Sequence, residues 1–186
     1  MLFDDFDLSH ALEGDGKVKF GYGVYVTSAY GSAAHYSGAN DSWARHYVYT
    51  LRVPVKREDN YIAFKVPVNE SIVRRAEEKL SVSIPEKYTV GGKEFRKFLA
   101  DSFAKDMAKT AGGKAADYKL VGEKAASEFL LAIGVEFIEW PYSWTNPKRG
   151  SNRAILDDRS IEIIQIDLVS LDDKKQLIPG SQTKIR

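Results

Sequence analysis

Apolar residues alternate with other residues in two early segments of the chain, over positions 18–26 and 47–55. A period of two is typical of a strand that buries one face. In the first segment, Gly21 and Gly23 predict a bend or a close approach between the backbone and a neighbouring group. In the second, Pro54 predicts that the strand ends there or lies at a sheet edge, because proline cannot donate a ladder hydrogen bond.

Further β segments follow later in the chain, and the last of them has an irregular pattern. Its apolar residues keep one phase up to Ile163 and take the opposite phase from Ile164. That change predicts a β-bulge or a strand buried on both faces. Glu162 and Asp167 are expected to face solvent. The strands predicted after residue 60 are 61–66, 135–140, 153–156 and 161–169.

The middle of the chain has the helical period instead, with apolar residues three and four positions apart. Glycines end two of the helices, at Gly112 and at Gly134. The longest helix is expected to bury Met107 and to turn Arg96 away from the core. The predicted helices are 70–81, 93–110 and 123–133.

Strands first, helices in the middle and strands last are the order of an α+β protein, not of repeated βαβ units. A chain of 186 residues is long enough for one sizeable core. We therefore expect one domain over residues 1–170 and a polar tail over 171–186 that frays or forms a loop.

The composition excludes several kinds of chemistry. The chain has no cysteine, which excludes disulfides, thiolate zinc sites and cysteine nucleophiles. Its three histidines argue against a histidine-rich metal site, so no metal is expected. No apolar run reaches the roughly 18 residues of a membrane helix, and no signal peptide is recognisable. A cytoplasmic protein with no membrane partner is expected.

Charge is distributed unevenly although the formal net charge is only +1. Residues 1–16 hold five acidic residues and no lysine or arginine, whereas residues 87–124 hold nine basic and five acidic residues. The basic region is either a solvated helix face or a surface for a polyanion.

One segment carries a resemblance to a known family. Residues 20–28 read Phe-Gly-Tyr-Gly-Val-Tyr-Val-Thr-Ser, and a second tyrosine, Tyr36, follows Tyr25. The segment resembles the F-G-x-G-[IV]-Y-F-A motif of the ADP-ribosyltransferase fold, as found in poly(ADP-ribose) polymerases, and the spacing of the two tyrosines matches without a gap. The sequence is more similar still to the ADP-ribosyltransferase-like domains of polyvalent proteins from phages and conjugative elements. The segments that carry this second similarity are 6–10, 14–16, 20–25, 126–130, 134–135 and 152–157.

This resemblance implies a split β core with a helical insertion at about residues 70–133, and NAD as the ligand. Gly21 and Gly23 would lie beside the nicotinamide, Tyr25 would form a wall of the pocket, and Tyr36 would stack on the ring. Ser32 neighbours Ala33, which stands where the family has the serine that holds the carboxamide. Asn152 stands where the family has its catalytic glutamate.

Two functions follow as alternatives. One is an ADP-ribosyltransferase-like protein of a mobile element that binds NAD and transfers ADP-ribose to an unknown protein or nucleic-acid acceptor. The other is a catalytically inactive module that binds a protein or a nucleic acid through the same cleft or the basic helix. The amide of Asn152 and the lack of the family's histidine-bearing first strand favour the second. Tyr25 and Tyr36 also fit ordinary core packing.

Overall fold

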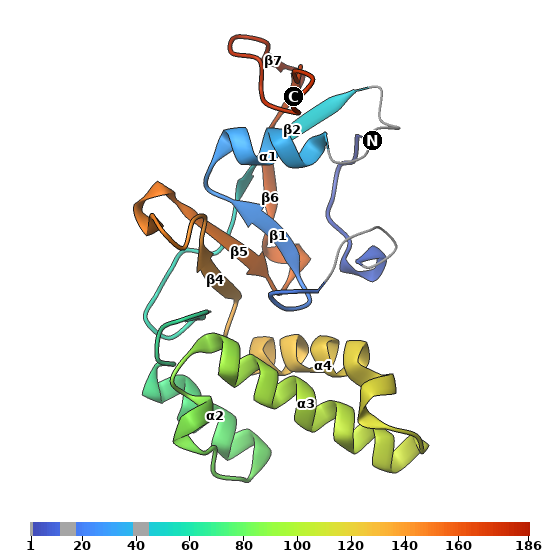
Figure 1. Cartoon of the computed structure of the whole chain (residues 1–186), viewed down its shortest axis with the longest axis vertical. Coiled ribbons are helices and arrows are strands. Elements are labelled where there is room, and N and C mark those ends of the chain that lie inside the picture. Colours follow the sequence, from blue (N-terminus) through green and yellow to red (C-terminus); the bar gives the residue numbers. More distant parts are fainter. Residues whose placement is uncertain (1, 12–17, 39–44) are drawn as a thin grey trace.

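The computed structural model describes residues 2–11, 18–38 and 45–186. In this part of the chain it contains four α-helices and two β-sheets, so the α+β class is confirmed. Figure 1 shows α2, α3 and α4 together at one end of the molecule and the strand β7 at the other. The helices are α1 (Tyr30–Ser37), α2 (Glu70–Leu80), α3 (Gly92–Ala111) and α4 (Lys119–Ala132). The strands are β1 (Val24–Thr27), β2 (His46–Arg52), β3 (Tyr61–Ala63), β4 (Phe137–Pro141), β5 (Ser151–Ile155), β6 (Glu162–Val169) and β7 (Thr183–Lys184).

The larger sheet has the strand order β1-β5-β4-β3, in which only the pair β3–β4 is parallel. The smaller sheet has the order β2-β6-β7 and is antiparallel. Between β2 and β6, Thr50 pairs with Gln165 and Leu51 with Ile163, so Ile164 is an extra residue on β6. This is the bulge predicted by the change of phase. Strand β2 ends two residues before Pro54, as the proline predicts.

The main core lies between the larger sheet and the helices. Its fully buried residues include Phe95 and Leu99 of α3, Leu130 of α4 and Ile138 of β4. Helices α3 and α4 approach closely at Gly122, where a Cβ atom would lie 2.4 Å from the carbonyl oxygen of Ala100. Only glycine permits this contact, because backbone cannot move aside as a flexible side chain can.

A second, smaller core joins α1 to the smaller sheet. Ala34 of α1 is buried with Val48 of β2 and Val169 of β6. The Tyr30 hydroxyl donates a hydrogen bond of 2.9 Å to Oδ2 of Asp167, whose side chain is buried on β6. The expectation that Asp167 faces solvent is therefore wrong, because a partner 137 residues away satisfies its carboxylate.

Three other expectations also fail. Residues 18–23 are not a strand, because the backbone turns at Gly21, whose φ is +119°. Arg96 is buried rather than exposed, since Glu123 of α4 accepts its guanidinium hydrogen bond, while Met107 is 40% exposed. The C-terminal tail is loop and turn over most of its length, and Thr183 pairs with Leu168 so that β7 joins the smaller sheet.

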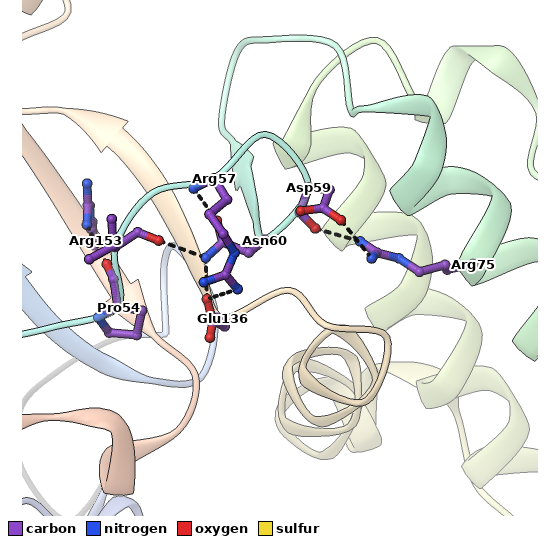
Figure 2. Close-up of polar contacts among 8 residues, drawn as sticks. Pro54, Arg57, Asp59, Asn60, Arg75, Glu136 and Arg153 are labelled. Carbon is purple, nitrogen blue, oxygen red and sulfur yellow. Dashed lines mark hydrogen bonds and ion pairs between the residues drawn. The ribbon is translucent and has the colours of Figure 1, made fainter.

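The linker formed by residues 53–60 runs from the smaller sheet to the larger one and is held by polar contacts (Figure 2). Asn60, 1% exposed, donates to the carbonyl oxygen of Val55 and to Glu136, and accepts from the backbone amide of Arg57. Its neighbour Asp59 accepts from Arg75 of α2 through both its backbone and its side chain. The linker is thereby fixed to the sheet and to α2 together.

Candidate functional site

Strands β1, β4 and β5 bring two of the predicted site residues to one face of the larger sheet. Thr27 pairs with Asn152, and Asn152 pairs with Trp140. Tyr25, two residues before Thr27, points to the same face because side chains alternate along a strand. The helices bury this face at Ile138 and Ala154, whereas Asn152 at its other end is only half-buried. We call the part of this sheet face that holds Tyr25, Thr27 and Asn152 the β1–β5 face.

Tyr25 is 43% exposed, but its hydroxyl group is already engaged. It accepts from the backbone amide of Phe20 and donates to the carbonyl oxygen of Gly21, both at 2.9 Å. Burial raises the pKa of the phenol, although the hydrogen bond from Phe20 opposes that shift. The ring contacts Trp140 edge-on, with 5.5 Å between the ring centroids. Tyr25 therefore offers a ligand the exposed part of its ring rather than its hydroxyl.

The two glycines contact the protein itself. A Cβ atom at Gly23 would lie 2.5 Å from the carbonyl oxygen of Ile155 on β5, and one at Gly21 would lie 2.6 Å from Cδ1 of Ile138. The close approach predicted from these glycines thus exists, between the chain segment and its own sheet.

Helix α1 carries the other predicted residues, Ser32 and Tyr36, one turn apart on the same side of the helix. Tyr36 is 71% exposed, and among the described residues its ring contacts only His35. The start of α1 is tied to the start of β5. The backbone amide of Ser28 donates to the carbonyl oxygen of Ser151, and the amide of Ser151 donates to Oγ of Ser28, both at 2.9 Å.

Asn152 has a side-chain amide that forms no hydrogen bond within the described part of the chain. Its carbonyl and amino groups are both available to a ligand or to water. On the described strands β1, β4 and β5, the face that holds Asn152 carries no carboxylate. Glu139 points to the opposite face, where it binds Arg153 at 3.0 Å and Lys56 at 2.5 Å. The β1–β5 face can therefore donate and accept hydrogen bonds, but it offers no general base.

Part of the resemblance, Gly14 to Gly16, lies outside the described residues, as do Glu13 and Asp15 of the acidic N-terminal segment. The preceding segment of the resemblance, residues 6–10, is among the described residues. Its Leu8–His10 segment is a short 3-10 helix over Tyr22, whose hydroxyl donates to the carbonyl oxygen of Leu8. His10 is exposed and lies 3.7 Å from Asp7.

The structure adds an aromatic cluster that the sequence pattern does not predict as a unit. Phe20 stacks on Trp140 with 4.0 Å between centroids and contacts Phe64 at 4.9 Å. Phe64 in turn contacts Trp144, at 6.1 Å, in the loop between β4 and β5. The signal in the sequence is the aromatic and basic composition of residues 140–149, which has no acidic residue.

Two hollows lie elsewhere. One, of about 150 Å³, is lined by residues of α3 and α4 that include Ala104, Lys119 and Glu123. The other, of about 230 Å³, lies between Leu8, Tyr22 and Lys124. No cluster of side chains suited to a metal ion occurs among the residues that the structure describes.

Comparisons with protein-family models, with curated proteins and with solved structures find no match to this chain. Within residues 2–11, 18–38 and 45–186, none of the helices has the length and apolar character needed to cross a membrane.

Proposed function

We propose that the protein is an ADP-ribosyltransferase-like binding module that holds NAD, or a nucleotide derived from it, on the β1–β5 face without transferring ADP-ribose. The observation that carries this proposal is the half-buried, unpartnered amide of Asn152 on the same face as the exposed ring of Tyr25. An amide of this kind pairs with the donor and acceptor of a carboxamide such as that of nicotinamide.

We add Ser32 and Tyr36 of α1 to the proposed site on the strength of the family resemblance. Tyr36 presents a ring that is 71% exposed, and a cationic nicotinamide ring favours an aromatic face. The backbone hydrogen bonds between Ser28 and Ser151 hold α1 and β5 at a fixed spacing, so a ligand would meet Asn152 on a rigid support.

The same face argues for binding over catalysis. Transfer of ADP-ribose develops positive charge on the ribose, which a carboxylate stabilises and a neutral amide does not. The nearest strand carboxylate, Glu139, lies on the other side of the sheet in an ion pair with Arg153. The alternative in which the basic helix binds a protein or a nucleic acid has less support, because Lys97 of α3 is paired with Asp101.

Calorimetric titration with NAD tests the proposal. We expect the wild type to bind and Tyr36→Ala to bind several-fold more weakly, because it loses the stacking ring, whereas Tyr36→Phe keeps most of the affinity. Asn152→Ala should weaken binding about three- to tenfold, the worth of a neutral hydrogen bond.

Absence of heat with NAD at millimolar concentration, or equal affinities for the wild type, Tyr36→Ala and Asn152→Ala, would overturn the site. Release of nicotinamide from NAD by the wild type would instead overturn the non-catalytic part of the proposal and leave the site standing.

A further inference from the structure

The loop between β4 and β5 presents exposed aromatic rings together with cations. Tyr142 and Trp144 are 41% and 44% exposed. Nζ of Lys65 lies 4.4 Å from the centroid of the Trp144 ring, and the guanidinium of Arg149 lies 5.9 Å from that of Tyr142. We define the loop surface as these four residues with Lys148, which is also exposed.

The cations of the loop surface have no acidic partner. Lys65, Lys148 and Arg149 form no ion pair with any carboxylate in the described residues. Residues 140–156 contain three basic residues and no acidic one. Of the six lysines of α3 and α4, three form ion pairs instead. Lys97 pairs with Asp101 at 3.0 Å, and Lys109 pairs with Asp106 at 2.9 Å.

The loop is also held in shape before any partner arrives. The amide of Tyr142 donates to the carbonyl oxygen of Gly150 at 2.9 Å, and the amide of Asn146 donates to Oγ of Ser143 at 3.2 Å. The Trp144 ring rests against Phe64, which is buried in the main core. An exposed ring fixed in this way costs little conformational entropy when a flat group stacks on it.

We infer that the loop surface binds single-stranded nucleic acid. Exposed rings match the faces of unpaired bases, and unpaired cations beside the rings match the phosphates that follow each base. In a duplex the base faces are hidden by stacking, so rings on a short loop have nothing to stack on. The inference is independent of NAD binding, since it uses neither Tyr36 nor Asn152.

Fluorescence anisotropy with a labelled mixed-sequence 12-nucleotide DNA at low salt tests the inference. We expect the wild type to bind, Trp144→Ala to bind about tenfold more weakly and Trp144→Phe to stay close to the wild type, because only the alanine variant loses the ring on which a base stacks. Lys65→Gln and Arg149→Gln should each reduce the slope of log affinity against log salt by about 0.7.

Two matched controls separate this site from other effects. Lys105→Gln makes the same charge change at an exposed position of α3 and is expected to leave the affinity unchanged. Asn152→Ala, which alters the proposed NAD site, is expected to leave DNA binding unchanged, and Trp144→Ala to leave NAD binding unchanged. Absence of binding, equal affinity of Trp144→Ala and the wild type, or tighter binding of the matching duplex would each overturn the inference.

Discussion

At the scale of single residues, Gly23 shows how a motif glycine can serve the fold. Its Cα approaches the backbone of β5 so closely that a Cβ would meet the carbonyl oxygen of Ile155 at 2.5 Å. Backbone atoms cannot rotate away, so any side chain at this position must separate β1 from β5. The position of Asn152 relative to Tyr25 depends on that pairing.

We predict that Gly23→Ala lowers the free energy of unfolding by about 1–3 kcal/mol, the usual cost of overpacking. The measurement is urea unfolding followed by circular dichroism. Gly31→Ala is the matched control, because a Cβ at Gly31 has no atom within 4 Å and alanine favours the helix. Equal stability of Gly23→Ala and the wild type would contradict the close approach of β1 to β5.

At the scale of elements, α1 is fastened to the smaller sheet by polar contacts as well as by packing, and one of these contacts reaches a buried carboxylate. Tyr30 donates to the buried carboxylate of Asp167, which also accepts from Gln165 at 2.8 Å. Burial and the adjacent carboxylate raise the pKa of Tyr30 to about 12. The neutral phenol is thus the form that stabilises this contact.

We predict that Tyr30→Phe destabilises the protein by about 1–3 kcal/mol at pH 7, because Asp167 loses a donor while it stays buried. In the unfolded chain Tyr30 titrates near pH 10. Its contribution is therefore fully present below that pH and is lost as the pH rises towards about 12. Unfolding curves between pH 7 and 11.5 should show the difference between the wild type and Tyr30→Phe shrinking as the pH rises. A difference that stays constant would contradict the assignment to the Tyr30 hydroxyl.

The elements also show which features can be predicted from sequence. The three middle helices follow from apolar spacing and from glycines such as Gly134, whose φ is +86°. The bulge at Ile164 follows from its phase. The burial of Arg96 does not, because it depends on Glu123 in another helix. Helix α1 does not follow from apolar spacing, since its small residues give no strong amphipathic pattern.

The candidate site also has features that the local sequence predicts and features that it does not. The motif around Tyr25 places this residue on a strand, as the structure has it, and local spacing is enough for that. The pairing of Thr27 with Asn152 joins positions far apart in sequence, and only the sheet register fixes it. Glu139 and Trp140 are neighbours on β4, so their side chains point to opposite faces of the sheet. The local sequence does not show which of these two faces holds the candidate site.

At the scale of the whole molecule, the 53–60 linker unites the smaller sheet, the larger sheet and α2. Asn60 is its centre, because its buried side chain both donates to and accepts from the backbone of the linker. The carboxylate of Glu136 receives hydrogen bonds from Asn60 and from Arg57, the latter at 3.0 Å. Loss of Asn60 would remove three hydrogen bonds made by a side chain that is itself buried.

We predict that Asn60→Ala lowers the free energy of unfolding by at least about 2 kcal/mol, because the buried side chain makes three hydrogen bonds and all three are lost. Asn152→Ala is the matched control. The same substitution at a half-buried amide without partners is expected to change stability by less than about 0.5 kcal/mol. Thermal unfolding of the two variants side by side makes the comparison, and similar midpoints would contradict the role given to Asn60.

The first and last described segments meet at one corner of the molecule. The guanidinium of Arg186 lies 2.6 Å from the carboxylate of Asp4, and Phe3 stacks on Tyr49 of β2 nearby, with 4.3 Å between centroids. An exposed ion pair of this kind adds little to stability. Its geometry has another consequence: the backbones at residues 4 and 186 lie no further apart than one aspartate and one arginine side chain can reach, so a host polypeptide could carry this fold as an insertion in a surface turn.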